Sequence, residues 1–462
     1  MRHAKKAKVK HTVDVSSDRI SGLPQDVKAR ILSHLNTDMA VRTTVLSSAW
    51  RNVWTAVPDI FLCDCTFCSC NASTKSDSSE ASKFVTLVDM VLSLHKGPLD
   101  TFTIHGTHNY HDVFARWIYK LSTKGPEDIT IKLTSGPQYK IPSSLFSISH
   151  LSFLYLKNCS ISLPKKFEGF KLLKVLKLKA FSSTDSDISN LISSCPHLDE
   201  VHLRYFKGIN CLSIQAQSIQ ILKIEGDFKD LRIDAPNLVI MYLRLDRVEG
   251  YQSVPVQGDM KSYLKQTFGS LTRIVSLNVG GSFLTYLSKG CMLTKVPGVF
   301  DDLEVLCMER CLWRWTEVVA ACSLFQNAPF LSELDIWVIV PPLHTNSYPY
   351  LLGCIYDFFN CLKPLQSYPR PEAFTRKGIW DQDETEIQTP KLDHLTMITL
   401  NDFRGLDCEV AFLGLLLSWA PALEEMKIKN IAEDTTDERI FKSTKKLLAF
   451  PRASTTAKII LT

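Results

Sequence analysis

The sequence predicts an α/β protein in which three short N-terminal helices precede a curved stack of repeats built on a parallel sheet. The chain has 462 residues, a length at which several domains or a one-dimensional repeat array replace a single compact core. Its hydrophobic content of 45% excludes a chain that is disordered throughout. Apolar residues follow a helical period near the N-terminus, and a strand pattern recurs through most of the remaining chain.

Residues 18–58 predict the three short helices. Pro24 suits the first position of the first helix, because its missing N–H would have no intrahelical partner there. The apolar residues that recur at helical spacing and form one face are Val27, Ile31, Leu32 and Leu35. This spacing predicts a helix with one apolar stripe.

Further polar residues mark where two more helices begin. Residues 36–38 offer caps for the second helix, and Ser47 and Ser48 offer caps for a third that carries Trp50 and Trp54. Three helices of this size are too few to bury all their apolar faces alone. We therefore expect the tryptophans to close a small local core, and the remaining apolar surface to receive a helix of a partner protein.

The two ends of this segment carry a motif. Ile20-Ser21-Gly22-Leu23-Pro24 opens it, and Leu46-Ser47-Ser48-Ala49-Trp50 closes it together with Trp54. The segment resembles an F-box of the plant type, which implies docking on a Skp-family adaptor and, through it, on a cullin-based ubiquitin ligase. By position, the residues that would face or support the adaptor are Leu23, Pro24, Ile31, Leu32, Val41, Leu46 and Trp50. The sequence departs from the motif at Lys28, where Leu is usual, and at Ala49, where Arg is common.

A second pattern follows the helices. The template L-x-x-L-x-L-x-x-(N, C or apolar) forms the strand of a leucine-rich repeat. Its copies begin at Leu99, Leu151, Leu173, Leu198, Ile219, Leu238, Ile274, Leu303, Leu331, Leu395 and Leu423. Most spacings lie near the roughly 20–29 residues of such repeats, and longer gaps indicate insertions. Each unit buries its leucines against its neighbours, so the stack forms a parallel sheet along one side.

Helical spacing reappears between the strands, in residues 84–92, 113–121 and 412–417. Residues 392–426 resemble the C-terminal FBD segment of plant F-box proteins, and residues 450–454 match its usual close. The resemblance to proteins with an F-box, leucine-rich repeats and an FBD-like region therefore covers nearly the whole chain.

The charge distribution is uneven only at the N-terminus. The chain carries 53 basic and 48 acidic residues, and the first ten residues hold five basic residues and no acid. Because the rest is balanced, we expect no nucleic-acid-binding surface across a whole domain. Lys5, Lys6 and Lys8 resemble a short nuclear-localisation signal, and a solvated tail explains them equally well.

Two clusters of cysteine and histidine residues are candidates for metal sites. The cysteine cluster consists of Cys63, Cys65, Cys68 and Cys70. Only its middle pair has the two-residue spacing of a zinc knuckle, so we expect a strand end and a loop there rather than a metal site. His105, His108 and His111 fit a solvated loop better than a zinc site. No familiar catalytic signature, signal peptide or apolar stretch long enough for a membrane helix is found. We expect a reduced, soluble protein of the nucleus or cytoplasm without catalytic residue, metal or cofactor.

These observations predict four parts: a basic disordered tail (1–17), an F-box (18–58), a repeat array (59–391) with an irregular insertion (340–390), and an FBD-like region (392–462). The resemblance implies a non-catalytic subunit of a Skp–cullin–F-box ubiquitin ligase that binds an unidentified target protein. Two alternatives stay open. One is an F-box receptor that senses a small ligand, and the other is a repeat scaffold outside any ligase, motivated by Lys28 and Ala49.

Overall fold

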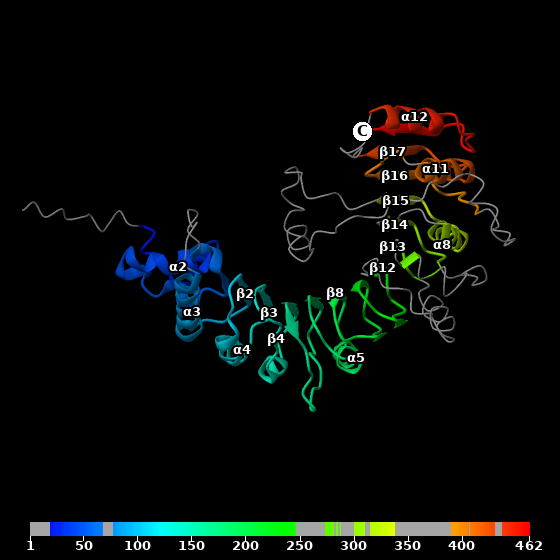
Figure 1. Ribbon diagram of the computed structural model, residues 1–462. Helices are drawn as coiled ribbons and strands as arrows, with labels where there is room; N and C mark the ends of the chain where they lie inside the picture. Colours follow the sequence, from blue (N-terminus) through cyan, green and yellow to red (C-terminus); the bar gives the residue numbers. More distant parts are fainter. Residues whose placement is uncertain are drawn as a thin grey trace, which may run out of the picture. The chain divides into compact units, whose positions relative to one another are not determined.

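A computed structural model describes residues 19–67, 77–245, 273–280, 283, 284, 287, 300–309, 315–337, 390–405, 407–429 and 437–462 (Figure 1). The chain divides into two compact units, Met1–Leu173 and Lys174–Thr462. The predicted tail, with Lys5, Lys6 and Lys8, lies outside the described residues, and so does the insertion apart from Pro390. No helix among the described residues combines the length and the apolar character needed to cross a membrane.

The first unit begins with helices and continues with a parallel sheet. Its main helices and strands are α1 (Gln25–Leu32), α2 (Thr37–Arg42), β1 (Asp59–Cys63), α3 (Asp77–Leu94), β2 (Thr101–Gly106), α4 (His111–Lys124), β3 (Asp128–Leu133) and β5 (Phe153–Lys157). The strands β1, β2, β3 and β5 pair in this order, and all are parallel. The helices predicted over 84–92 and 113–121 are confirmed as α3 and α4.

The third predicted helix is wrong. The chain forms 3-10 turns instead, η2 (Thr43–Val45), η3 (Ser48–Trp50) and η4 (Val53–Ala56). Ser47 is fully extended, with φ −164° and ψ 168°, and Asn52 has φ −118° and ψ 6°. These two residues interrupt helical geometry on both sides of Trp50, so only single turns fit between them.

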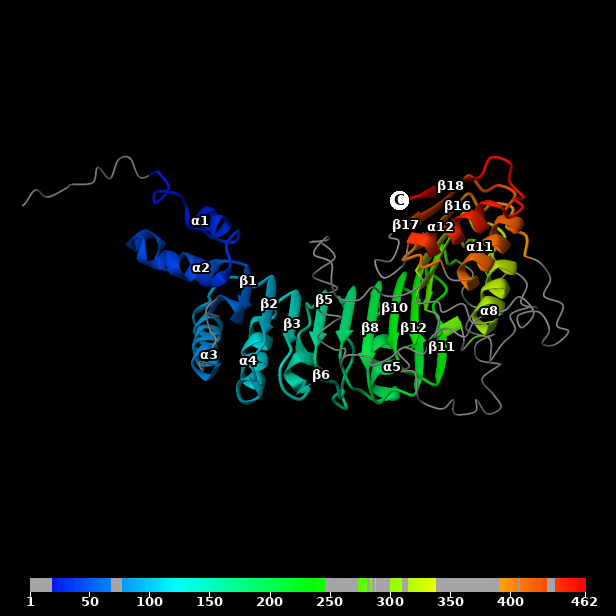
Figure 2. The same cartoon turned by 45° about the horizontal axis from the view of Figure 1, so that its top comes forward.

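The second unit is a longer parallel stack (Figure 2). Its sheet order is β7 (Val175–Lys179), β8 (Glu200–Phe206), β10 (Ile221–Gly226), β12 (Ile240–Leu245), β13 (Ser276–Gly280), β14 (Val305–Glu309), β15 (Glu333–Trp337), β16 (Met397–Asn401), β17 (Glu425–Lys429) and β18 (Lys458–Leu461). The helices are α5 (Asp185–Ser193), α8 (Trp315–Gln326), α11 (Asp407–Trp419) and α12 (Asp437–Leu448). The helix predicted over 412–417 is confirmed as α11.

The leucine template predicts the strands closely. In all eleven copies, the strand begins two residues after the first residue of the template. The template side chains point inward, as in β7, where Leu176 and Leu178 are 0% and 1% exposed. Among the strands without a template copy, β3 and β18 were not predicted because Pro126 and Thr456 stand at the template's first position. The α/β solenoid predicted from the sequence is thus confirmed.

The segments that return between strands are not all helical. In two consecutive repeats of the second unit, short strands replace the helix: β9 (Cys211–Gln215) pairs in parallel with β11 (Asp230–Asp234). In the first unit β4 (Tyr139–Lys140) and β6 (Cys159–Ser160) do the same. The chain leaves three sheet strands through residues with positive φ, namely Asn158, Ala180 and Asp402, and a fourth such residue, Tyr205, lies within β8 where its register with β10 shifts.

Candidate docking surface on the N-terminal helices

Large apolar side chains are exposed on the N-terminal helices and the turns after them. Seven of the sixteen such side chains in the described part of the chain fall within residues 20–46. They are Ile20, Val27, Ile31, Leu35, Met39, Val45 and Leu46. The largest exposures are those of Val45 (85%) and Leu46 (69%). We call these seven side chains the apolar surface, and contiguous exposed apolar patches are typical of interaction sites.

The opposite side of the same helices forms a small core. On α1 the buried residues are Lys28, Ala29 and Leu32, whereas Val27 and Ile31, one turn apart, face solvent. α1 packs against η4, where Val53 is fully buried and Trp54 is 6% exposed. The expectation that Trp50 and Trp54 close a local core is therefore confirmed. The apolar surface is what this core leaves uncovered.

Lys28 belongs to this core although it is charged. Its side chain is buried, and its Nζ lies 5.8 Å from the centroid of the Trp50 ring. The Trp50 Nε1 donates a hydrogen bond of 3.2 Å to the Ser21 hydroxyl. The ring face thus provides a cation–π partner for the ammonium group, which explains how a lysine is accepted where the motif usually has Leu.

The helices are firmly tied to the first repeat. The Phe61 N–H of β1 donates to the Thr37 hydroxyl at 2.8 Å. The N–H groups of Lys96 and Gly97 both donate to the carbonyl oxygen of Thr55, at 2.8 and 3.1 Å. A Cβ on Gly97 would lie 2.9 Å from the Ala56 Cα, so this close approach of two backbones requires glycine. The helices are therefore held on the repeats by hydrogen bonds that backbone N–H groups of the repeats donate.

A buried histidine completes this connection. His95 Nε2 lies 2.8 Å from the Val57 carbonyl oxygen. Burial, with a smaller contribution from Lys124, lowers the pKa of His95 in spite of that contact. The ring is therefore neutral near pH 7 and fits the apolar junction.

The structure places the predicted adaptor residues in two environments. Pro24, Ile31 and Leu46 are exposed, and Leu23 and Val41 are partly exposed. Leu32 and Trp50 lie in the core, at 2% and 8% exposure, and so support the surface from beneath. Sequence reasoning did not assign Ile20, Val27, Leu35, Met39 and Val45 to the surface. A helical period shows which residues share a face, but it does not show whether that face is inside.

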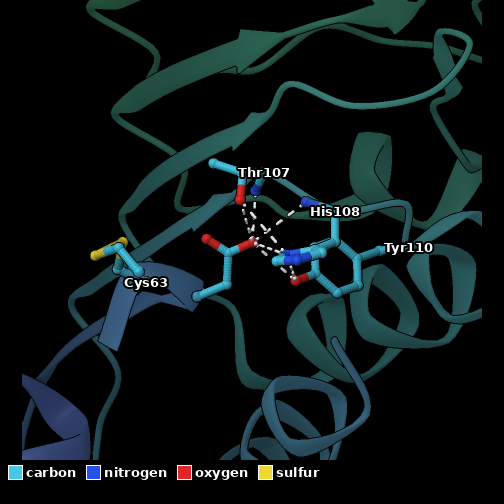
Figure 3. Close-up of a disulfide and its surroundings, with 6 residues drawn as sticks. Cys63, Thr107, His108 and Tyr110 are labelled. Atoms are coloured by element: carbon cyan, nitrogen blue, oxygen red, sulfur yellow. Dashed lines mark hydrogen bonds and ion pairs between the residues drawn. A yellow bond between two sulfur atoms is a disulfide. The ribbon is translucent and has the colours of Figure 1, made fainter. Parts of the chain in front are cut away.

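The cysteine cluster ends β1 and continues into a turn. Cys63 and Cys65 form a disulfide (Figure 3), so the expectation of reduced thiols is wrong for this pair. Cys68 and Cys70 lie outside the described residues. Among the described residues, no three His, Cys, Asp or Glu side chains are arranged to hold a metal ion.

Asp64, between the two cysteines, organises the neighbouring loop. Its Oδ2 accepts from the Thr107 N–H (2.5 Å) and hydroxyl (3.1 Å), from the Tyr110 hydroxyl (2.9 Å) and from the His108 N–H (3.3 Å). The His108 Nδ1 lies 3.0 Å from the same oxygen (Figure 3). Burial raises the pKa of Asp64, but the contacts from His108, Thr107 and Tyr110 outweigh it and hold this pKa below its ordinary value. The residue locks the end of β1 to the β2–α4 loop.

The three histidines of the predicted solvated loop have separate structural roles. His105 lies in β2 and packs edge-on against Phe61, at 5.2 Å between ring centroids. His111 begins α4, stacks on Tyr139 at 4.0 Å, and has its Nε2 2.9 Å from the Pro137 carbonyl oxygen. The solvated loop is therefore a wrong prediction. The rings do not point to one metal position, because each is fixed by a different partner.

A buried ion network crosses the outward face of the second unit. Glu225 on β10 is fully buried, and it accepts from Arg204 Nε at 2.7 Å and from Arg244 Nη1 at 2.8 Å. Burial raises the pKa of Glu225, but the two guanidinium groups outweigh it and lower this pKa. Arg244 Nη2 donates to Glu309 Oε2 at 3.3 Å, and the Tyr242 hydroxyl donates to the same oxygen at 2.9 Å. We call this network the ion ladder.

Gly280 makes the longer step of the ladder possible. It lies on β13, between the strand of Arg244 and the strand of Glu309. A Cβ on Gly280 would lie 3.1 Å from the Arg244 Cγ. The missing side chain leaves room for Arg244 to pass over β13 and reach Glu309.

Comparisons with known proteins agree with this architecture. Residues 114–336 match a family described as FBD-associated F-box protein At5g56370, LRR repeats. The F-box/FBD/LRR-repeat protein At1g13570 of Arabidopsis thaliana is 27% identical over 450 residues, which cover 96% of this chain and 98% of the relative. The putative FBD-associated F-box protein At5g22720 of the same plant is 32% identical over about half of each chain, 50% and 51%.

A further relative extends over most of the chain. The putative F-box/LRR-repeat protein At3g58880 of Arabidopsis thaliana is 25% identical over 71% of this chain and 75% of its own length. These matches agree with three features of the chain, namely the motif at residues 18–58, the eleven template strands and the parallel solenoid. Over nearly its whole length the chain is similar to plant F-box proteins with leucine-rich repeats and an FBD region.

Proposed function

We propose that this chain is a non-catalytic substrate-recognition subunit of a Skp–cullin–F-box ubiquitin ligase. The N-terminal helices dock on a Skp-family adaptor, and the repeats bind a target protein. The observation that carries the proposal is the apolar surface on the F-box segment, opposite a core that is already closed. A partner's apolar helix is the natural cover for such a surface.

The mechanism is positional. Holding a target beside a charged ubiquitin-conjugating enzyme raises the effective concentration of its lysines, so the chain itself needs no bond-making residue. The solenoid suits this role because each strand presents outward side chains that vary without disturbing the buried leucines. Adaptor binding and target binding are thus carried by different residues of one chain.

The adaptor test compares exposed apolar residues inside and outside the F-box segment. The double variant Ile31→Glu/Leu46→Glu places charges on the apolar surface and leaves the core residues unchanged. We expect its affinity for a purified Skp-family adaptor to fall about 100-fold or more in calorimetry. The control Leu94→Glu/Leu172→Glu changes two leucines that are each 48% exposed elsewhere in the first unit, and it should bind as the parent does.

The outcome separates the proposal from its alternative. Absence of binding by the folded parent chain would remove the ligase role and favour a scaffold outside any ligase. Equal losses in the two double variants would show that the apolar surface is not the docking site. Circular dichroism and the unfolding midpoint of each variant establish that it is folded.

The nuclear or cytoplasmic location is also a proposal, and it rests on Lys5, Lys6 and Lys8. Replacing all three by Ala in a fluorescent fusion should lower the nuclear share of the signal in plant cells. An unchanged distribution would show that these lysines belong to a solvated tail.

A further inference from the structure

The outward face of β7, β8, β10 and β12 has a regular arrangement of side chains. Lys177, His202, Lys223 and Tyr242 are register partners on neighbouring strands and form a central row. Lys179, Arg204, Glu225 and Arg244 form a second row beside it in the same register. Val175, Glu200, Ile221 and Ile240 form a third row on the other side. We call these three rows the cationic face.

The cationic face has more positive than negative side chains. Five residues are lysine or arginine, and only Glu200 and Glu225 are acidic. Glu225 is already shared by two arginines of the ion ladder. Glu200 Oε1 lies 3.3 Å from Lys177 Nζ and 2.6 Å from His202 Nε2. Within the described residues Lys223 has no ion-pair partner, so the positive surplus is uncompensated in the middle of the face.

The lowered pKa of His202 reflects the same positive charge. Burial lowers its pKa to about 4, and Lys223, Lys177 and Arg204 contribute in the same direction against Glu200. The ring is therefore neutral at physiological pH. The positive charge of the face comes from lysines and arginines alone, and it persists through the whole physiological range.

The face is also partly apolar, and it has a clear limit. Ile240 is 37% exposed, and Val175 and Ile221 are half-buried beside the central row. Further along the same sheet the outward charges change sign, with Glu309 on β14 and Glu333 and Asp335 on β15. A ligand with acidic and apolar groups is complementary to β7–β12 and is repelled beyond it. This combination differs from a double-stranded nucleic-acid site, whose affinity comes mainly from many phosphate contacts.

The spacing of the cations indicates an extended ligand. Lys177 and Lys223 are separated by one intervening strand, which corresponds to about 10 Å at the usual strand separation. A peptide in the extended polyproline II conformation has three residues per turn and rises about 3.1 Å per residue, so side chains three residues apart lie on the same side and cover about this distance. We propose that the cationic face binds an extended acidic segment of the target protein, with acidic residues spaced about three apart and apolar residues between them. This inference rests on the proposed function, because it names the kind of target that the repeats recognise.

The test uses the full chain and a fluorescent twelve-residue peptide with four repeats of Glu-Leu-Ser. Matched peptides carry Gln or Lys in place of Glu, and a twelve-nucleotide single-stranded DNA is the non-protein polyanion. By fluorescence polarisation at low salt we expect the Glu peptide to bind at least about tenfold more tightly than the Gln peptide, and more weakly as salt rises. Equal affinities of these two peptides, no binding, or tighter binding of the DNA would overturn the proposal.

Charge reversal locates the site. In Lys177→Glu/Lys223→Glu the Glu peptide should bind at least about tenfold more weakly, and the Lys peptide should gain affinity. The control Lys174→Glu/Lys207→Glu has the same change in net charge at two exposed lysines outside the three rows, and it should stay within about twofold of the parent. An equal loss in the control would show that only net charge matters, and would overturn the site.

Adaptor binding by the same variants keeps the two proposals apart. Loss of peptide binding with intact adaptor binding in Lys177→Glu/Lys223→Glu supports the cationic face. A parent chain that binds the adaptor and ignores the Glu peptide refutes only the acidic target. A parent chain that binds the Glu peptide and not the adaptor refutes only the ligase role.

Discussion

The N-terminal helices and the repeats use regular apolar spacing in opposite ways. On α1 the side chains of Val27 and Ile31 recur every four residues, and they face solvent. On every template strand the residues of the L-x-L pattern face inward, as Leu222 and Ile224 do on β10. The charged groups differ as well, because the ion ladder pairs four charged side chains on the outward face of the repeats with one another. Apolar surface that the folded chain leaves exposed is therefore a better indicator of a binding partner than regular apolar spacing in the sequence.

The largest expected effect comes from opening the ion ladder. Glu225→Ala leaves Arg204 and Arg244 without their shared carboxylate, and breaking a buried ion pair from one side costs about 3–5 kcal/mol. Urea unfolding of the full chain, followed by circular dichroism, should show this loss in the second unit. The control Glu424→Ala, at an exposed residue, should change the free energy of unfolding by less than about 0.5 kcal/mol. Similar values for both would mean that the ladder contributes no stability.

Two consecutive residues of α1 allow its buried and exposed faces to be compared directly. Leu32 is 2% exposed and Ile31 is 42% exposed. Leu32→Ala should lower the stability of the first unit by about 2–4 kcal/mol, since it leaves a cavity in a small core. Ile31→Ala should cost less than about 1 kcal/mol in unfolding and still weaken adaptor binding. If the stability losses were reversed, the assignment of inner and outer faces would be wrong.

The pH dependence of stability tests His202. Its pKa is about 4 in the folded chain and near 6.5 when unfolded, so between these values the unfolded chain binds the extra proton. Stability from this group is complete above pH 6.5 and decreases as the pH falls toward 4. His202→Gln should flatten that decrease in unfolding curves recorded across the interval, whereas the exposed-site control His197→Gln should not. An unchanged slope in His202→Gln would contradict the lowered pKa.

The smallest effect concerns the exits of the strands. Ala180 follows β7 with φ 52°, a conformation that disfavours any side chain, so Ala180→Gly should raise stability by about 1 kcal/mol. Ala115 is an exposed residue within α4, where Ala115→Gly should lower stability by about 1 kcal/mol. Shifts of the unfolding midpoint in opposite directions would confirm the strained exit, and shifts in the same direction would contradict it.

The fold was largely predictable because each repeat is a local event. Three leucine-type residues at fixed offsets define a strand wherever they occur, and this gave eleven strand starts without knowledge of neighbours. The missed elements have weaker local signals. Thr184 caps α5 through its hydroxyl, which accepts from the Asp187 N–H, and the apolar pattern of that short helix is limited to Ile188, Leu191 and Ile192. The 3-10 turns around Trp50 depend on the extended backbone of Ser47, which the sequence does not reveal.

The candidate sites were less predictable, since they depend on residues that meet across elements. The resemblance to an F-box located the segment that we propose as the docking site, but only packing against η4 decides that Leu32 is inside and Ile31 outside. The ion ladder joins Arg204, Arg244 and Glu309 through strands that are separated in the sequence. His111 likewise contacts Tyr139, which is distant in the sequence. The three histidines that the sequence places in one loop therefore have three unrelated partners in the structure.

By itself, the sequence determined the class of the protein: an F-box segment followed by leucine-rich repeats, because both motifs are short patterns of side chains with fixed local spacing. Tertiary structure alone decided which apolar residues stay exposed, how Lys28 is accommodated over Trp50, and that cations of β7–β12 gather on one face. The physical reason is that burial and electrostatic fields are sums over neighbours in space. A local pattern fixes an element, and only its packing fixes the surface that remains for a partner.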